Sequence, residues 1–318
     1  MLVMVMPWDQ RIKRRFKLRE LDILIAVAEA GGMAKAASRL HMSQPAVSKA
    51  IADLEHTLKV RLVDRSRQGV EPTDYGLALI KRGVAVFDEL RQGVQDIEFI
   101  ADPTAGELRI GVTVALIDAI VSPIIGRLTL HHPRMAFQVV AGDMAMLLRE
   151  LMERDIELAI GRITGPVADK SLTVQSLFED NLVVATNAKS PWCRRRKIDL
   201  TELMNEPWTL PPFQTFFGSL VAESFRASGI EAPRLTVATS SQSLRNHLLA
   251  TGRFLTIVPT FSLKLPRRHP SLKALPVELP NMRHPIAIIT LKNRSLSPLA
   301  LLFIERVRVL TRAIAKDN

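Results

Sequence analysis

Apolar residues recur at helical spacing near the start of the chain. Leu18–Ala30 carries such a pattern and stops at two glycines, as a helix does at its C-terminus. In the next stretch, 34–58, the pattern is interrupted at His41 and Met42, which predicts two short helices joined by a sharp turn. The buried face of the second helix is then Val47, Ile51, Leu54 and Leu58.

The residues around the turn suit a helix-turn-helix. Ser43 is a good N-cap, and Pro45 falls in the first helical turn, where its missing N–H costs nothing. His41 is of a residue type that tolerates positive φ. Such a motif reads the major groove with the N-terminal residues of its second helix. The side chains expected there are Ser43, Gln44, Pro45, Ser48 and Lys49. The alternative is a helical hairpin in an unrelated core.

Two further elements follow before the first break in the chain. Residues 60–75 alternate and then restart at a threonine, which predicts a two-stranded wing. Its Arg65 and Arg67 would meet the sugar-phosphate backbone or the minor groove of DNA; a solvated loop is the alternative. Asp74–Ala101 reads as one long helix with a narrow apolar seam, typical of a paired helix. The seam residues recur every seven positions, as Ile80, Phe87, Val94 and Ala101, with Gly83, Leu90 and Ile97 between them. The alternative is a helix of a large internal core. Residues 103–106, PTAG, end this region.

Beyond the break, short apolar strands alternate with amphipathic helices. This order predicts α/β layers with largely parallel sheets. The predicted strands are 108–113, 137–140, 158–161, 181–185, 207–210, 235–238, 255–258 and 285–290, and the predicted helices are 116–131, 144–154, 220–229, 242–250 and 298–314.

The N-terminal residues resemble those of LysR-type transcriptional regulators. The matching positions are Ala36-Ala37, Leu40, Ser43-Gln44-Pro45-Ala46-Val47-Ser48, Ile51, Leu54-Glu55, Leu62, Asp64-Arg65, Thr73 and Gly76. Two positions depart from the family pattern: Lys59 replaces a common glycine and Val63 a common phenylalanine.

The resemblance implies the domain organisation. A basic N-terminal extension, 1–17, precedes a winged helix-turn-helix domain at 18–75 and a linker helix that forms the dimer contact at 76–106. An α/β effector-binding domain follows at 107–318, with two lobes of periplasmic-binding-protein type. These lobes are 107–181 with 286–318, and 182–285.

Charge supports a nucleic-acid partner. The formal net charge is +11, and residues 1–67 hold 13 Lys and Arg against 7 Asp and Glu. A basic end beside a helix-turn-helix predicts binding to phosphate-rich DNA. Cys193 is the only cysteine, which excludes an internal disulfide and favours a reducing, cytoplasmic setting. We find no apolar run of the ~18–20 residues that span a bilayer, so no membrane partner is expected.

Ligand contacts are expected beyond the carboxyl ends of the predicted strands. Helix N-termini there suit a carboxylate or phosphate, hydroxyl groups add neutral donors, an arginine pairs an anion, and a phenylalanine stacks on a ring. For each serine or threonine, plain helix capping is an equal alternative. The resemblance implies a small effector, commonly an organic anion. The candidate residues are Thr113, Ala115, Arg162, Phe213, Gln214, Ser240 and Ser241.

Catalytic and metal-binding patterns are absent from the sequence. It contains no glycine-rich phosphate loop, no GxSxG and no HExxH, so neither an enzyme nor a cofactor is expected. The expected partners are an operator in double-stranded DNA, a small effector, a second copy of the chain in a dimer or tetramer, and RNA polymerase. The rival hypotheses are an enzyme with an attached DNA-binding domain, a solute-binding protein, and an architectural DNA-binding protein.

Overall fold

The computed structural model describes residues 16–66, 69–165, 167, 169–263 and 272–316. Residues 1–15 of the predicted extension, and Arg67, therefore lie outside the described residues. Contacts divide the chain into two compact units, Met1–Val94 and Gln95–Asn318, so the division falls within a long helix. Each unit is described by itself.

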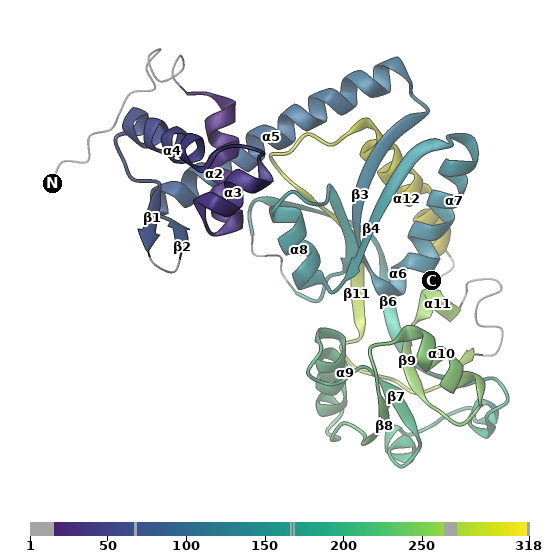
Figure 1. Ribbon diagram of the computed structural model, residues 1–318. Helices are drawn as coiled ribbons and strands as arrows, with labels where there is room; N and C mark the ends of the chain where they lie inside the picture. The colour runs from purple at the N-terminus through teal and green to yellow at the C-terminus, as the bar shows by residue number, and fades with distance from the viewer. Residues whose placement is uncertain (1–15, 67–68, 166, 168, 264–271, 317–318) are drawn as a thin grey trace. The chain divides into compact units, whose positions relative to one another are not determined.

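The first unit is a small helical domain with a hairpin (Figure 1). Its helices α2, α3 and α4 pack around one apolar core, and the predicted wing is a two-stranded antiparallel sheet. Leu24, Val27, Ala36, Ile51 and Leu54 are fully buried there. The bounds are α2 Leu18–Ala30, α3 Met33–Arg39, α4 Gln44–Leu58, β1 Val63–Ser66, β2 Gly69–Pro72 and α5 Asp74–Ala101.

Two non-glycine residues in the described part of this unit have left-handed backbone. His41, in the turn between α3 and α4, has φ 52°, which confirms the expectation from its residue type. Lys59, directly after α4, has φ 55° and ψ 30°. The left-handed backbone at Lys59 explains why glycine is common at this position in the family pattern. A residue with a Cβ is strained in this conformation, and glycine is not.

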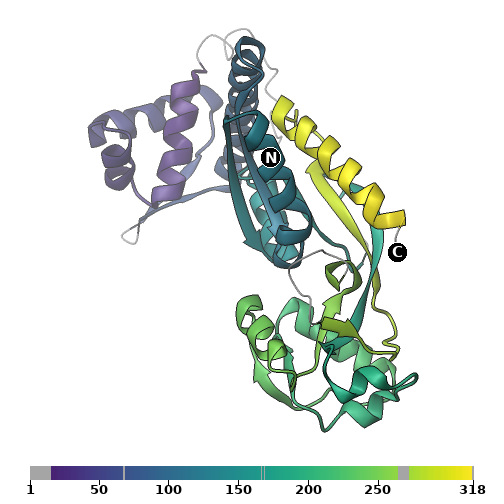
Figure 2. The ribbon, with the colours of Figure 1, turned by 90° about the vertical axis from the view of Figure 1, so that its right-hand side faces the viewer.

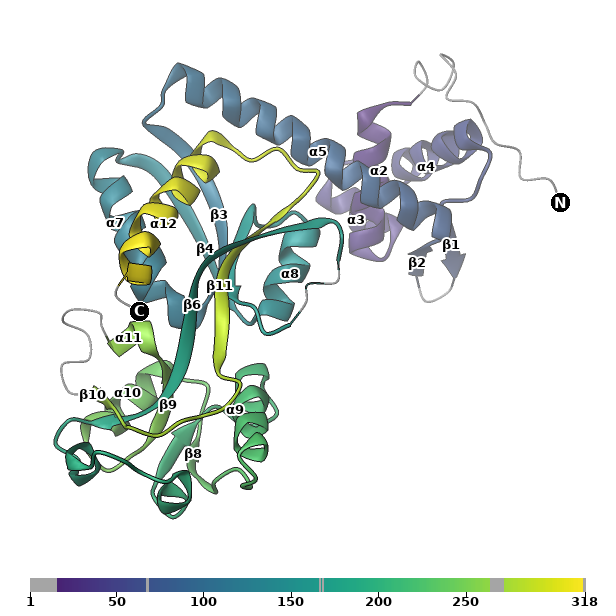
Figure 3. The ribbon, with the colours of Figure 1, turned by 180° about the vertical axis from the view of Figure 1, so that it is seen from behind.

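The second unit has two lobes built on one continuous sheet. Its strand order is β10-β6-β11-β5-β3-β4, with β9 also paired to β6. Here β9 is Thr256–Pro259 and β10 is Leu272–Ala274. Lobe 1 contains β3 (Ala105–Thr113), β4 (Arg134–Gly142), β5 (Leu158–Arg162) and parts of β6 (Leu172–Asn187) and β11 (Arg283–Leu291). Figure 3 shows β6 and β11 running together from lobe 1 towards lobe 2.

The prediction of a largely parallel sheet is wrong in this unit. Strands β3, β4 and β5 are parallel, but β11 pairs antiparallel with β5 and β6, and β6 pairs antiparallel with β9 and β10. Strands β6 and β11 both pass between the lobes and form one long antiparallel pair. Leu172 pairs with Leu291 at one end of this pair, and Asn181 pairs with Arg283 at the other. The sequence predicted only 181–185 of β6.

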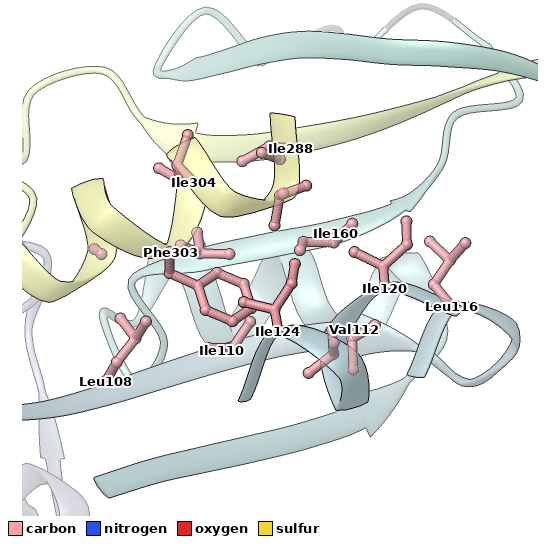
Figure 4. Packing of buried hydrophobic residues seen from close by; sticks show 14 of the residues in the cluster. Leu108, Ile110, Val112, Leu116, Ile120, Ile124, Ile160, Ile288, Phe303 and Ile304 are labelled. Atoms are coloured by element: carbon pink, nitrogen blue, oxygen red, sulfur yellow. The ribbon is translucent and has the colours of Figure 1, made fainter. Parts of the chain in front are cut away.

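Helices cover both faces of the lobe 1 sheet. On one face lie α6 (Val114–Leu116), a π-helical segment (Ile117–Val121), α7 (Ser122–His131) and α12 (Pro298–Lys316), the yellow helix of Figure 2. Their apolar side chains meet Ile110 and Ile160 of the sheet (Figure 4). On the other face lies α8 (Met144–Met152), whose Leu147 packs so closely that a Cβ at Gly111 would meet it at 3.0 Å.

One helical run corrects the expectation about membrane spans. Val114–His131 is long and apolar enough to cross a membrane, by length and composition alone. In the structure its Leu116, Ile120, Ile124 and Leu128 are buried in the core of lobe 1. Packing on the sheet therefore accounts for the buried residues of this run, which are 33% of it.

Lobe 2 surrounds a second core centred on Trp208, which stacks edge-on with Phe225 and donates to the Leu203 carbonyl at 2.8 Å. The helix predicted at 220–229 is longer: it begins at Phe216, because Thr215 caps it. The bounds are 3-10 turns Pro191–Arg194 and Leu200–Leu203, β7 Trp208–Leu210, α9 Phe216–Ala227, β8 Leu235–Ala238, α10 Gln242–Ala250, β9 Thr256–Pro259, α11 Thr260–Leu263 and β10 Leu272–Ala274.

Candidate nucleic-acid interface and ligand site

Helix α4 exposes polar side chains at its N-terminal end and buries one apolar face in the domain core. The Ser43 hydroxyl accepts from the backbone N–H of Ala46 at 3.4 Å, and Pro45 lies in the first turn. The buried face, Val47, Ile51 and Leu54, fixes the helix in the core. Ser43, Gln44, Pro45 and Lys49 are exposed and Ser48 is half-buried, so the predicted contacts of α4 lie together at its N-terminal end.

The wing is tied to α4 by side-chain hydrogen bonds. Arg65 of β1 donates through Nη1 to the Ser48 hydroxyl at 3.3 Å. Glu55 of α4 accepts from the backbone N–H groups of Leu62 and Val63, at 2.8 and 3.3 Å. These contacts place the cation of Arg65 next to the exposed end of α4. Arg67, the other predicted contact of the wing, is outside the described residues.

This surface can read DNA in two ways. Gln44 carries an amide that can pair with the edge of an adenine, and the cations Lys49 and Arg65 can neutralise phosphates. Glu55 was not among the DNA contacts predicted from the sequence. It lies at an internal position of α4, and only the structure shows that its carboxylate anchors the start of β1.

Helix α5 carries exposed apolar side chains where the seam was predicted. Leu90, Val94 and Ile97 are 50%, 54% and 68% exposed, at steps of four and three residues on one helix face. Gly83, earlier on the same seam, instead faces α2: a Cβ there would lie 2.8 Å from the side chain of Leu21. The seam therefore divides into an N-terminal part packed inside the domain and a C-terminal part open to a partner.

The lobe 1 candidates for the ligand site lie at the carboxyl ends of β3 and β5. Thr113 is the last residue of β3, and a Cβ at Gly161 of β5 would meet the Thr113 methyl at 2.9 Å. Thr113 makes no side-chain cap to α6, and Ala115 is exposed. Thr113 and Arg162 thus come from adjacent ends of the parallel strands β3 and β5.

Arg162 is already engaged by the protein. Its guanidinium forms an ion pair with the Asp180 carboxylate and donates from Nη1 to the Asp180 carbonyl at 3.0 Å. Asp180 lies on β6 and also accepts from the backbone N–H of Phe261 at 3.1 Å. Burial raises the pKa of Asp180, against the opposing influence of Arg162. Asp180 has no counterpart among the sequence-based candidates.

His284 completes this group of titratable residues. It pairs with Asp180 across the β11–β6 ladder, and its Nε2 is buried without a hydrogen-bond partner among the described residues. Burial lowers the pKa of His284, and the positive charge of Arg162 lowers it further. The strand ends of lobe 1 therefore hold the ion pair of Arg162 and Asp180, with His284 paired to Asp180 in the ladder, at the point where β6 and β11 leave for lobe 2.

The lobe 2 candidates follow β7 and β8, which are parallel neighbours. Gln214 and Ser240 are exposed, whereas Phe213 packs against the core of lobe 2. Ser241 caps α10 by accepting from the Leu244 N–H at 3.3 Å, so the capping alternative holds for this hydroxyl. Within the described residues, no hydrogen bond joins this set to Thr113, Ala115 or Arg162.

Arg245 is a cation of lobe 2 that the sequence-based list omitted. It lies one turn after Ser241 on α10 and donates to the Thr239 carbonyl at 3.0 Å. Burial lowers its pKa. The sequence could have suggested Arg245 as a candidate, because it lies four residues after Ser241 and therefore on the same side of the helix.

The described residues offer little for metal or thiol chemistry. No group of three or more His, Cys, Asp or Glu side chains lies together in this part of the chain. Cys193 donates from Sγ to the Asn187 carbonyl at 3.3 Å, and burial raises the pKa of its thiol. A raised pKa leaves the thiol protonated and poorly nucleophilic.

Comparison with known proteins covers nearly the whole chain. The family model described as "Bacterial regulatory helix-turn-helix protein, lysR family" matches residues 18–77, and the one described as "LysR substrate binding domain" matches residues 101–311. The transcriptional regulator GbpR of Azospirillum brasilense is 28% identical over 92% of this chain and 86% of its own. The uncharacterised regulator YdcI of Escherichia coli is 27% identical over 95% and 98%.

Solved structures show the same fold. Full-length OxyR from Pseudomonas aeruginosa has a TM-score of 0.64 at 21% identity, covering 95% of this chain and 97% of its own. CbnR, a LysR family regulator, has a TM-score of 0.51 at 24% identity, covering 92% and 100%. The helix-turn-helix, the two-lobed α/β domain and both family matches lead to one conclusion. The chain belongs to the LysR family of bacterial transcriptional regulators, with a DNA-binding and an effector-binding domain.

Proposed function

We propose that the chain binds an inverted-repeat operator as a homo-oligomer, and that a small organic anion in its α/β domain controls this binding. The observation that carries the first part is the bond between Arg65 of the wing and Ser48 of α4. It gathers an amide, hydroxyls and cations on one surface, which is the chemistry needed for base edges and phosphates.

In this proposal some residues of α4 contact bases, and the cationic residues of α4 and the wing contact phosphates. Gln44 and Ser48 contact base edges in the major groove, supported by Ser43 and Pro45 at the start of the helix. Lys49, Arg65 and Arg67 contact phosphates and fix the register of the protein on DNA. CbnR has been solved in complex with its target DNA, which shows that a protein of this fold engages DNA.

We assign the self-association to α5. Its exposed side chains Leu90, Val94 and Ile97 would bury one another in a paired helix. A single recognition helix reads few base pairs, and two-fold pairing doubles the site. The proposed organisation is the DNA-binding domain at 18–75, the dimerisation helix at 76–106 and the effector-binding domain at 107–318, preceded by the basic extension.

The effector site is proposed at the strand ends of the two lobes. Thr113, Ala115 and Arg162 contribute from lobe 1, and Phe213, Gln214, Ser240 and Ser241 from lobe 2. An anion that competes with Asp180 for Arg162 would bind one lobe arrangement better than the other. Only such a difference in affinity can couple a ligand to DNA binding.

The setting follows from the same function. We propose a cytoplasmic regulator without catalytic activity, which acts on transcription through contact with RNA polymerase. Turnover of a metabolite by the purified protein would contradict this.

DNA affinity selection over the whole genome, with the purified full chain at about 0.15 M salt, tests the proposal. Recovery of a discrete inverted repeat supports sequence-specific binding, because nonspecific binding is driven by phosphates alone. Uniform recovery of all fragments, or of none, would contradict it. Genes beside a recovered site would then indicate candidate effectors, to be tested for a change in footprint, DNA bend or oligomeric state.

A further inference from the structure

Lobe 1 has a groove of its own between α7 and α12, which lie side by side on the sheet (Figure 1). Its volume is about 510 Å³, within the range of about 300–1,000 Å³ of small-molecule sites. None of the residues proposed above for the effector lines it. The lining residues are Pro123, Ile124, Arg127, Leu128, His131, His132, Arg306, Val309 and Leu310.

The groove combines an apolar floor with positive charge. Ile124 and Leu128 are buried at its base, and Val309 is 55% exposed at its side. Arg127 of α7 and Arg306 of α12 are exposed and have no ion-pair partner among the described residues. No carboxylate is among the described residues that line the groove. The described lining therefore carries two arginines and no carboxylate beside an apolar surface.

We propose that this groove binds a small amphipathic carboxylate, with its head group paired to Arg127 and Arg306 and its apolar tail on Ile124, Leu128, Val309 and Leu310. The head group gains charge-assisted hydrogen bonds from guanidinium groups, which match carboxylates in geometry. The tail covers the side chain of Val309, which is otherwise 55% exposed to water. This is a second ligand site, separate from the proposed effector site.

The test measures binding of decanoate to the full-length protein by isothermal titration calorimetry. Decanol is the matched uncharged probe. We expect one decanoate site per chain in the groove, and an affinity for decanol about tenfold weaker because it lacks the charge. The variant R127Q/R306Q should weaken decanoate binding by about tenfold or more and leave the affinity for decanol nearly unchanged. The control R149Q/R312Q removes the same charge from exposed sites outside the groove.

A second pair of variants tests the location without changing charge. V309W places a bulky ring in the groove, whereas L301W adds the same ring at a site on α12 that is 56% exposed and outside the lining. We expect V309W to abolish decanoate binding and L301W to preserve it. Absence of decanoate binding to the wild-type chain would overturn the proposal, and so would equal losses in the groove and control variants.

Discussion

The guanidinium of Arg162 on β5 forms an ion pair with the carboxylate of Asp180 on β6, and both side chains are almost fully shielded from water. Asp180 also accepts from the N–H of Phe261, whose ring packs edge-on against Phe178 in the core of lobe 1, 6.0 Å between centroids. Asp180 therefore joins the end of β5 to the α11 segment that follows β9 of lobe 2. The charged pair therefore lies at the junction of the two lobes.

Removing Arg162 alone should be more damaging than removing the pair. R162M leaves the Asp180 carboxylate buried without a counter-charge, so we expect a loss of about 3–5 kcal/mol in the free energy of unfolding at neutral pH. The double variant R162M/D180N removes the buried charge as well, and should recover part of that loss. Urea denaturation of both variants measures this. If the double variant is less stable than R162M, the pair does not behave as a buried ion pair.

The stability of the protein should depend on pH through His284. Its pKa is lowered from the ordinary 6.5, so the fold favours the neutral ring. The unfolded chain then binds the proton first as pH falls, and the wild type loses stability below about pH 6.5. H284Q cannot titrate and lacks this loss. We therefore expect the free energy of unfolding of the wild type, relative to that of H284Q, to decrease as the pH falls from 8 to 5.5. An unchanged difference would contradict the assignment.

The roles proposed for Gln44 and Arg65 are separable by experiment. Q44A should relax discrimination at one base pair by about 1–3 kcal/mol while preserving the salt dependence. R65A should weaken binding to all sequences and reduce the slope of log K against log salt by about one. Binding of each variant to the selected operator and to single-base variants, at several salt concentrations, measures both effects. Similar behaviour of the two variants would show that the roles are wrongly assigned.

Lys59 offers a stabilising substitution. Its left-handed backbone, φ 55°, strains a residue with a Cβ, and glycine adopts this conformation freely. We expect K59G to raise the free energy of unfolding of the DNA-binding domain by about 0.5–1 kcal/mol, after the greater flexibility of glycine in the unfolded chain is included. K59A is the control, because it removes the charge and keeps the strain. Equal effects of K59G and K59A on the denaturation midpoint would exclude backbone strain as the cause.

The exposed seam of α5 predicts a surface for self-association. L90E/V94E places charges where two helices would bury apolar side chains, so we expect the dimer to dissociate and operator affinity to fall. D96N, on an exposed position of the same helix, is the control. Light scattering after size-exclusion chromatography measures the mass. A full-length L90E/V94E protein that remains dimeric would place the contact elsewhere.

Local patterns in the sequence were sufficient for many of the elements. The caps at Ser43 and Ser241, the left-handed turn at His41 and the helical spacing of Val47, Ile51 and Leu54 depend on residues within a few positions of one another. Their energies come from local backbone geometry and from one apolar face, which the order of residue types encodes directly.

Tertiary structure decided which charges meet and which way the strands run. Arg65 bonds to Ser48, Arg162 pairs with Asp180, and β11 lies antiparallel to β5. The polar partners are 17 and 18 residues apart in the chain. An alternating apolar run looks the same in a parallel and in an antiparallel strand, and a charged residue does not specify its partner. Both are fixed only when distant segments pack, because burial makes an unpaired charge costly and so selects the arrangement that pairs it.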